Sequence, residues 1–308
     1  MNEIYQKTLS KKVSFKGIGL HSGKCVKINV CPAEANEGIV FKRVDLIKNN
    51  IIEANYKNVS SAKLCTTLEN SYGIKVSTVE HLLAAFYIAG IDNALVEIND
   101  EEVPIMDGSS KDFLDILEKE ELTAQSEKRK YLKILNKVEL VDGKRTISIE
   151  PNNSSLKVKF QLYYDNKIIG NQKNTVDFQA DNLNEVSSSR TFCLYEDIEK
   201  IKKFGLAKGG SLDNAVVVDN DKVLNEGGLR NEKEFVNHKI LDLAGDFLLS
   251  GYRVLGKVEC YQGGHELTNL FLKKIFMQKN AFEFIEKKEF KISKKFSPQV
   301  LGKLAVNA

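Results

Sequence analysis

The sequence predicts an α+β protein built from two domains of similar plan. Residues 1 to about 120 read as short alternating strands followed by helices, and the second half repeats this order. Two segments are alike, since each is a helical pattern that ends at a glycine and leads into a strand. They are EHLLAAFYIAGIDNALVEI, residues 80–98, and HKILDLAGDFLLSGYRVLGKVE, residues 238–259. We infer a weak internal duplication whose domains face one another, and such clefts are common ligand sites.

The first half is expected to hold strands and then helices. Polar and apolar residues alternate where half-buried strands are expected, and helical periodicity follows in STVEHLLAAFYIAG. Ser77 or Thr78 is expected to cap the start of that helix, and Gly90 to end it. The expected elements are strands at 11–20, 25–30 and 39–44, a helix at 77–90, a strand at 93–98 and a capped helix at 108–120.

A polar stretch, KEELTAQSEKRK at residues 119–130, is interpreted as the linker between the domains. It predicts an N-terminal domain of residues 1–125 and a C-terminal domain of residues 126–308. The second half is expected to contain a hairpin at 131–150 with an Asp-Gly turn, strands at 156–164 and 174–179, an insertion at roughly 193–224 with a helix and then a strand, a long helix at 232–249, a strand at 253–261 and a last helix from 265.

Composition describes an ordinary globular chain. The 308 residues are 42% hydrophobic and 28% charged, with a formal net charge of +3. This excess is too small to indicate nucleic acid, but it fits an anionic small substrate. Five cysteines without a C-x-x-C pair indicate reduced thiols. Because neither a secretory signal nor a membrane span is visible, we expect a cytoplasmic protein that can still touch a membrane surface.

The predicted long helix carries a histidine and two aspartates four residues apart. His238, Asp242 and Asp246 therefore lie on one stripe, beside the apolar Phe235 and Leu241. A carboxylate is seldom buried unless it is paired or bound to a metal. His and Asp one turn apart can both reach one cation, as the two His of H-E-x-x-H reach zinc. The alternative is a surface helix with polar residues at chance spacing.

A zinc site with one open position needs a third protein ligand, and His81 and His21 are the histidines outside this region. His81 directly follows Glu80, which would place a carboxylate beside the metal without ligating it. Such a group can act as a general base on water at the metal. Ser77-x-x-Glu80 also matches a helix capping box, and spacing favours neither interpretation. For His21, the alternative is a hydrogen-bonded loop histidine.

His265 follows a pair of glycines at the start of the last helix. Glycines let the backbone pack close to a ligand, so this histidine can point into a cleft. It could donate a proton to a leaving group, and Asp246 could orient the imidazole and favour its charged form. The turn SSSRTF, residues 187–192, indicates by itself only a loop.

Six stretches complete the pattern: GIGLHSG, STVEHLLAAF, VPIMDGSS, SRTF, KEFVNHKILDLAGD and GGHELTN. Each is weak alone. Together they span nearly the whole chain and closely resemble, in the same order, the motifs of bacterial UDP-3-O-acyl-N-acetylglucosamine deacetylases, the zinc hydrolases of lipid A synthesis. The resemblance implies two similar α/β sandwich domains, each a small mixed sheet packed on helices, with the zinc between them.

The resemblance also implies a role for each candidate residue. The implied roles are zinc ligands for His81, His238 and Asp242, general base for Glu80, catalytic acid for His265 with Asp246 as its partner, an oxyanion contact for Thr191, a lining position for Phe192 and contact with the anionic nucleotide-sugar for Lys239. The insertion at 193–224 would form a hydrophobic passage for the acyl chain. Gln262 departs from the basic residue frequent before the G-H motif, so no charged contact is expected from that position.

The implied reaction is zinc-dependent hydrolysis of the N-acetyl group of UDP-3-O-(3-hydroxyacyl)-N-acetylglucosamine, which releases acetate in the committed step of lipid A biosynthesis in Gram-negative bacteria. We expect a monomer that binds this substrate and does not bind nucleic acid. A contact with the inner membrane, if there is one, is expected to be peripheral. Two alternatives stay open. One is a nucleotide-sugar or lipid-binding module with a structural metal, although structural zinc usually has four protein ligands. The other is a zinc amidase for a different amide.

Overall fold

Each half of the chain begins with strands and contains a helix–strand–helix unit, and the computed structural model describes residues 4–286. The first half contains β1 (Tyr5–Leu9), β2 (Val13–Ile18), β3 (Cys25–Pro32), β4 (Ile39–Arg43), β5 (Ile51–Glu53), the 3-10 helix η1 (Tyr56–Asn58), β6 (Val59–Ser61), β7 (Thr67–Glu69), β8 (Lys75–Val76), α1 (Glu80–Ala89), β9 (Ala94–Ile98) and α2 (Lys111–Leu117). The second contains β10 (Leu122–Lys128), β11 (Lys130–Ile134), β12 (Val138–Asp142), β13 (Arg145–Pro151), β14 (Leu156–Tyr163), β15 (Asn171–Asp177), α3 (Asn184–Ser187), β16 (Phe192–Leu194), α4 (Tyr195–Lys203), β17 (Val216–Asp219), β18 (Lys222–Val223), α5 (Glu234–Leu248), β19 (Arg253–Tyr261), α6 (His265–Met277) and β20 (Phe282–Glu286).

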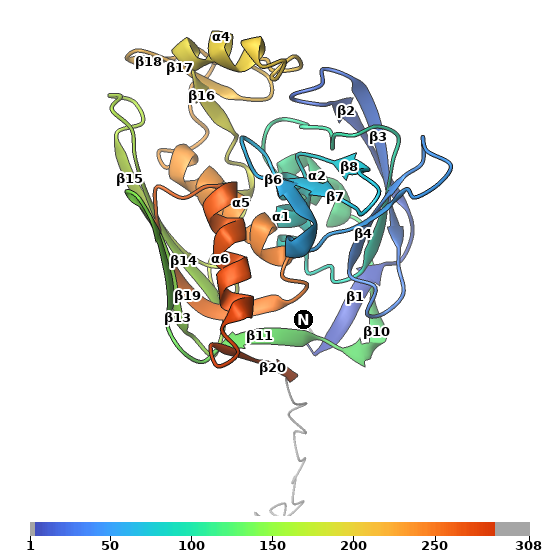
Figure 1. The fold of residues 1–308 in the computed structure, drawn as a ribbon. Helices are drawn as coiled ribbons and strands as arrows, with labels where there is room; N and C mark the ends of the chain where they lie inside the picture. The colour runs from blue at the N-terminus through green and yellow to red at the C-terminus, as the bar shows by residue number, and fades with distance from the viewer. Residues whose placement is uncertain (1–3, 287–308) are drawn as a thin grey trace, which may run out of the picture.

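Two mixed sheets enclose a layer of helices (Figure 1). One sheet has the order β2-β3-β9-β4-β5, and the other has the order β12-β13-β19-β11-β20 with β14 and β15 attached through β19. In each half a helix leads through a glycine turn into an interior strand, α1 into β9 and α5 into β19. The predicted fold class is therefore confirmed. The predicted boundary at residues 125 and 126 falls within β10 and stays a prediction, and residues 287–308 of the predicted second domain lie outside the described part.

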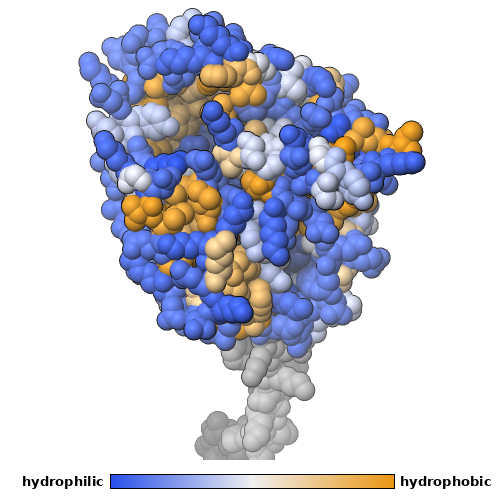
Figure 2. Space-filling view, viewed as in Figure 1, coloured by the Kyte–Doolittle hydropathy of each residue, from blue (hydrophilic) through white to orange (hydrophobic). Residues whose placement is uncertain are grey.

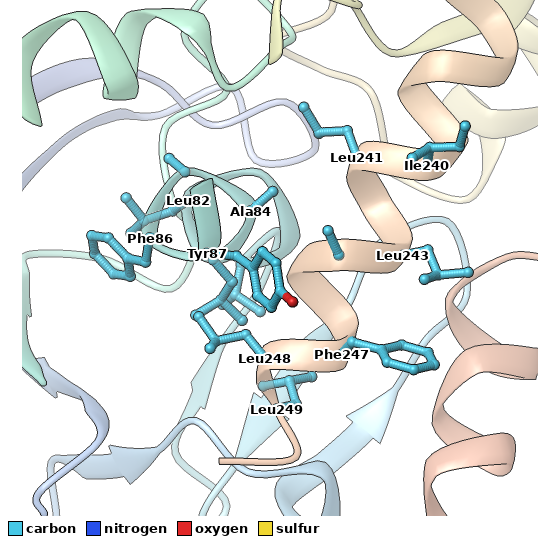
Figure 3. Close-up of a cluster of buried hydrophobic side chains, with 14 of the residues drawn as sticks. Leu82, Ala84, Phe86, Tyr87, Ile240, Leu241, Leu243, Phe247, Leu248 and Leu249 are labelled. Carbon is cyan, nitrogen blue, oxygen red and sulfur yellow. The ribbon is translucent and has the colours of Figure 1, made fainter. Parts of the chain in front are cut away.

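The layer of helices is held together where α1 crosses α5. A Cβ added at Gly245 would lie 2.1 Å from the Glu80 carbonyl oxygen, so only a glycine allows the two backbones this close. Apolar side chains pack around the crossing, and Ala84 and Tyr87 from α1 and Leu248 from α5 lie between the two helices (Figure 3). The site candidates on the two helices are thereby fixed relative to one another by packing.

Residues 122–128 of the predicted linker form a strand, β10, which the sequence did not indicate. This strand pairs antiparallel with β1, from Tyr5 opposite Lys128 to Leu9 opposite Leu122. A two-stranded sheet leaves most side chains of β10 exposed, so its sequence is as polar as a linker while its backbone is hydrogen-bonded. Strand β1 was not anticipated either.

The predicted N-cap of α1 is also wrong. The cap is Val79, without a side-chain hydrogen bond. Ser77 Oγ instead donates to the Glu101 carbonyl at 3.3 Å, and Thr78 Oγ1 donates to Glu102 Oε1 at 3.1 Å. Thr78 has a positive φ of 56°, which is unusual for a β-branched residue, and this sharp turn directs the chain into the helix.

The other helix ends and turns follow the sequence closely. Gly90 ends α1 in the left-handed conformation, with φ of 84°. Strands β12 and β13 form the predicted hairpin, and its Gly143 has φ of 58°. The predicted insertion contains α4 and then β17, which runs parallel to β16.

Candidate metal site

Three side chains from two helices converge where α1 crosses α5. His81 lies in the first turn of α1, and His238 and Asp242 lie one turn apart on α5. Asp242 Oδ1 is 3.5 Å from His81 Nε2 and 3.3 Å from His238 Nε2. The three potential ligand atoms lie within 4.8 Å of one another, and all three residues are buried. This cluster can hold one metal ion.

The protonation states of His238 and Asp242 suit a cation. His238 Nδ1 lies 3.0 Å from the Ser189 carbonyl oxygen, so it donates there and leaves the Nε2 lone pair free. Burial lowers the pKa of His238 to about 3, so the ring is neutral near pH 7. Burial acts to raise the pKa of Asp242, but neighbouring His238 and Lys239 hold it well below its usual value.

Asp242 Oδ1 is the atom that most directly indicates a missing partner. It is buried and accepts no hydrogen bond from any residue in the described range 4–286. Buried carboxylate oxygens are normally paired, because an unpaired one is costly. A cation between Oδ1 and the two imidazole nitrogens would satisfy it.

Glu80 lies beside this cluster without belonging to it. Its Oε2 accepts a 3.0 Å hydrogen bond from the Thr66 backbone N–H, and its Oε1 lies 3.7 Å from His265 Nε2. The carboxylate is therefore not engaged in a capping box with Ser77, whose hydroxyl bonds elsewhere. Burial raises the pKa of Glu80 above its ordinary value, against the opposing effect of His265. A carboxylate with a raised pKa is a better proton acceptor.

His265 stands opposite Glu80 at the start of α6. Its Nδ1 lies 2.8 Å from Asp246 Oδ2, and its Nε2 lies 3.8 Å from Asp242 Oδ2. Burial acts to lower the pKa of His265, but the carboxylates of Asp246, Glu80 and Asp242 outweigh it and raise the pKa to about 10. The imidazole therefore carries a proton on the Nε2 that faces the site.

A loop containing the SRTF motif closes one side of the site. Arg190 forms a buried ion pair with Glu234 of α5, with Nε 2.7 Å from Oε1. The next residue, Thr191, donates its backbone N–H to the Gly108 carbonyl and accepts one from Val216. Gly108 has no room for a side chain, since an added Cβ would lie 2.1 Å from the Asn214 carbonyl oxygen. The motif around Gly108 thus has a packing role that the sequence did not reveal.

Phe192 and Lys239 meet beside the cluster. Lys239 Nζ lies 2.9 Å from Asp242 Oδ2 and 5.5 Å from the centre of the Phe192 ring. Phe192 packs edge-on against Phe235 of α5, at 4.9 Å between ring centres. Both residues that the family resemblance placed near the site are therefore close to it, and the ammonium is bonded to a potential metal ligand.

The site opens into a larger apolar cavity. A small pocket of about 30 Å³ is lined by the candidate ligands, Glu80 and His265. A cavity of about 390 Å³ adjoins it and shares Leu20, His21, Leu64 and Thr191 as lining. The larger cavity is otherwise lined mainly by the insertion, including Ile198, Ile201, Leu212, Ala215, Val217 and Leu224.

Comparison with known proteins decides the family. Residues 6–277 match the family described as LpxC, UDP-3-O-acyl N-acetylglycosamine deacetylase. The chain belongs to this deacetylase family. A protein of Haemophilus ducreyi named UDP-3-O-acyl-N-acetylglucosamine deacetylase is 40% identical over 285 residues, which cover 92% of this chain and 93% of that protein. Proteins with the same name from Idiomarina loihiensis and Francisella tularensis subsp. tularensis are each 41% identical, covering 92% and 91% of this chain and 93% and 99% of theirs.

Membership of the deacetylase family confirms the resemblance found in the six motifs. The chain is an enzyme, and the family is a family of metalloenzymes. Among residues 4–286, no helix combines the length and apolar character that crossing a membrane requires.

Several residues of this deacetylase site escaped sequence reasoning. Thr66 contacts both Glu80 and Asp246, with its Oγ1 2.7 Å from Asp246 Oδ1. Cys65 lines the small pocket, and burial raises its pKa to about 12, so the thiol is neutral. Both come from the short loop before β7, which has no periodicity, and its one charged residue, Lys63, does not indicate a site. Only the spatial arrangement could reveal them.

His21 and Gln262 are held by hydrogen bonds to residues far away in the sequence. His21 accepts at Nδ1 from the Ala207 backbone N–H at 3.4 Å and donates its own backbone N–H to Glu102, as the loop interpretation predicted. The Gln262 side chain bonds both the N–H and the carbonyl of Tyr163. Gln262 therefore pairs with the backbone of the last residue of β14.

Proposed function

We propose that this chain hydrolyses the N-acetyl group of UDP-3-O-(3-hydroxyacyl)-N-acetylglucosamine, a step of lipid A biosynthesis, with zinc held by His81, His238 and Asp242. The observation that carries the proposal is the juxtaposition of this buried cluster with two groups outside it. Glu80 Oε1 and His265 Nε2 lie 3.7 Å apart beside the cluster, one able to accept a proton and the other to donate one.

Zinc is the metal that the donor set favours. Two imidazole nitrogens and one carboxylate oxygen are typical of catalytic zinc sites, which keep a fourth position open. The orphaned Asp242 Oδ1 and the neutral ring of His238 are in the states that coordination needs. Zinc, when bound there, supplies Lewis-acid polarisation of the acetyl carbonyl and makes nearby water more acidic.

The chain's own residues move the protons. Thr66 holds Oε2 of Glu80, so Oε1 is free to take a proton from the attacking water. His265 Nε2 donates a proton to the sugar nitrogen, because an amine leaves poorly without one. Asp246 holds the other ring nitrogen, at 2.8 Å, and keeps the imidazole charged and oriented. Each such proton transfer typically contributes about 10² to 10⁴ in rate.

Substrate contacts are assigned to the residues around the cluster. Thr191 lies at the junction of the two cavities and would help to hold the oxyanion. Lys239 also lines a separate cavity of about 240 Å³ together with Lys144 and Arg145. Arg145 pairs with Asp142 and Lys239 with Asp242, and the group of three cations supports a contact between Lys239 and the anionic nucleotide part of the substrate. Phe192 would line the site between the two.

The apolar cavity of the insertion is proposed to take the acyl chain. Its side chains are mainly apolar, and it joins the metal pocket through Leu20, Leu64 and Thr191. Figure 2 shows apolar residues gathered around a hollow beneath the polar region of α4. A chain in this cavity would exchange water for apolar contact along its length.

The same region supports a peripheral contact with an anionic lipid surface. Phe204 is 78% exposed and Leu64 is 51% exposed, and Lys63 lies over the Phe204 ring at 5.8 Å. Apolar and basic groups side by side are what a membrane surface attracts. Sedimentation with phosphatidylglycerol vesicles, but not with neutral ones, would support this contact, and loss of sedimentation in Phe204→Ser would locate it.

Cytoplasmic location, a monomeric state and the absence of a nucleic-acid partner remain proposals. The five cysteines are all unpaired, which is typical of a reducing compartment. Cell fractionation tests the location, and sedimentation velocity tests the oligomeric state. A mobility-shift assay tests the absence of nucleic-acid binding.

The reaction itself is tested by acetate release from the purified chain. We expect turnover of UDP-3-O-(3-hydroxyacyl)-N-acetylglucosamine that is lost after chelation and restored by zinc. Binding of the substrate without any acetate release would favour the binding-module alternative. Release of acetate only from an unrelated amide would favour a different zinc amidase.

A further inference from the structure

We propose that Thr66 is a positioning residue for both proton-transfer groups of the reaction. The inference rests on the proposed roles of Glu80 and His265. Thr66 lies in the loop before β7 and is 2% exposed. It contacts one oxygen of Glu80 and one oxygen of Asp246, and so joins the two sides of the proton-transfer machinery through a single residue.

The backbone of Thr66 fixes the general base. Its N–H donates to Glu80 Oε2 at 3.0 Å, and its carbonyl accepts from the Val79 N–H at 3.4 Å. Val79 is the residue that precedes α1, so these two bonds hold both the start of the helix and its first side chain. With Oε2 occupied, the carboxylate cannot rotate freely, and Oε1 faces His265.

The side chain of Thr66 fixes the partner of the acid. Its hydroxyl donates to Asp246 Oδ1 at 2.7 Å, while Asp246 Oδ2 lies 2.8 Å from His265 Nδ1. Each oxygen of the aspartate thus has its own partner. A carboxylate held at both oxygens presents a fixed direction to the imidazole, and hydrogen bonds to a charged group are stronger than neutral ones.

The hydrogen bonds of Thr66 also link the two halves of the chain. Thr66 and Glu80 belong to the first half of the chain, whereas Asp246 and His265 belong to the second. The hydroxyl of Thr66 therefore fixes the position of the acid, His265, relative to the base, Glu80, across the interface between the halves. Removal of a hydrogen bond to a charged group typically costs about 10-fold to 100-fold.

The side-chain role is tested with Thr66→Val, which removes the hydroxyl and keeps the backbone N–H. We expect kcat for acetate release to fall by about 10-fold to 100-fold, with KM within about twofold and the metal content unchanged. Thr66→Ser keeps a hydroxyl and should retain at least roughly half of the wild-type kcat. Thr8→Val is the matched control, because Thr8 is a buried threonine of β1 whose hydroxyl accepts from Ala33, and its kcat should not change.

A double-mutant cycle separates positioning from a general loss of stability. If Thr66 acts through Asp246, adding Thr66→Val to Asp246→Ala should lower kcat by less than about twofold further. A structural role would make the two effects multiply. The cycle uses kcat of folded, metal-loaded protein, with the thermal midpoint measured for each variant.

Two results would overturn the inference. One is a folded, metal-loaded Thr66→Val with kcat within about twofold of wild type, and the other is a cycle in which the effects multiply. If Thr66→Val does not fold, Thr66→Ala, which introduces no new methyl group, takes its place under the same criteria. Normal turnover of Glu80→Ala and His265→Ala would instead overturn the proposed function itself, so the two failures are distinguishable.

Discussion

The crossing of α1 and α5 and the insertion at 193–224 are built in opposite ways. Every residue of α5 except Lys239 is buried, and two of its carboxylates pair with buried residues of other segments, Glu234 with Arg190 and Asp246 with His265. Helix α4 of the insertion has no buried residue, and its Lys200–Asp197 ion pair is exposed. Groups whose positions must be fixed lie where packing leaves little freedom, whereas the segment proposed to take a flexible chain has few buried contacts and is expected to open locally.

The largest effects are expected from the two proton-transfer residues at the crossing. Glu80→Ala and His265→Ala should each lower turnover by about 10² to 10⁴ and retain the metal, because neither is assigned as a ligand. Glu283→Ala, at an exposed carboxylate of β20 that pairs with Lys133, is the control and should be normal. Steady-state kinetics with metal analysis checks this. An unfolded Glu80 variant would mean that Glu80 mainly supports the helix start, and normal turnover in both variants would contradict the catalytic assignment.

The crossing itself is tested by Gly245→Ala. The added methyl would lie 2.1 Å from the Glu80 carbonyl oxygen, so α1 must move away from α5. We expect the free energy of unfolding to fall by roughly 1–3 kcal/mol, as overpacking does, and turnover to fall because Glu80 and His81 shift. Gly→Ala inside a helix otherwise stabilises the folded protein by about 1 kcal/mol. A loss of stability measured by denaturant titration can therefore be assigned to the contact between the two helices. Unchanged stability and turnover would mean that the helices adjust freely.

The pH dependence of kcat/KM should be bell-shaped. The acid limb reflects Glu80, which must be ionised, and burial raises its pKa; the alkaline limb reflects His265, which must be protonated. Neighbouring carboxylates raise the pKa of His265 to about 10 against burial, and a bound dication would lower it. Asp246→Ala removes the strongest of these carboxylates while burial persists, so the alkaline limb should move to lower pH. A shift to higher pH would contradict the role of Asp246.

The smallest effect per change is expected in the insertion. Each methylene removed from the acyl chain should weaken kcat/KM by up to about 0.8 kcal/mol where that group is buried. A series of substrates with successively shorter chains measures this. An enzyme indifferent to removal of the whole chain would show that Ile198 and Ile201 only pack the insertion against its own domain.

The sequence predicted the candidate metal ligands better than the residues and strands that hold them in place. His238 and Asp242 could be placed together because a helix repeats every 3.6 residues, and the family motifs added His81 from a distant helix. Nothing in the sequence placed Thr66, because its contacts depend on how a loop meets two helices. Strand β10 was missed for a related reason, since its pairing with β1 uses backbone groups that leave no pattern in the side chains. Ser77 matched a capping box by spacing alone. The turn at Thr78 directs the Ser77 hydroxyl to the Glu101 carbonyl instead.

Metal content after dialysis is the most direct test of the claim that His81, His238 and Asp242 hold a catalytic zinc ion. We predict about one zinc per chain in the wild type and in Glu80→Ala, since three protein ligands with an open position define such a site. His238→Ala, which removes one ligand, should lose both the zinc and the activity. Full zinc and full turnover in His238→Ala would contradict the assignment.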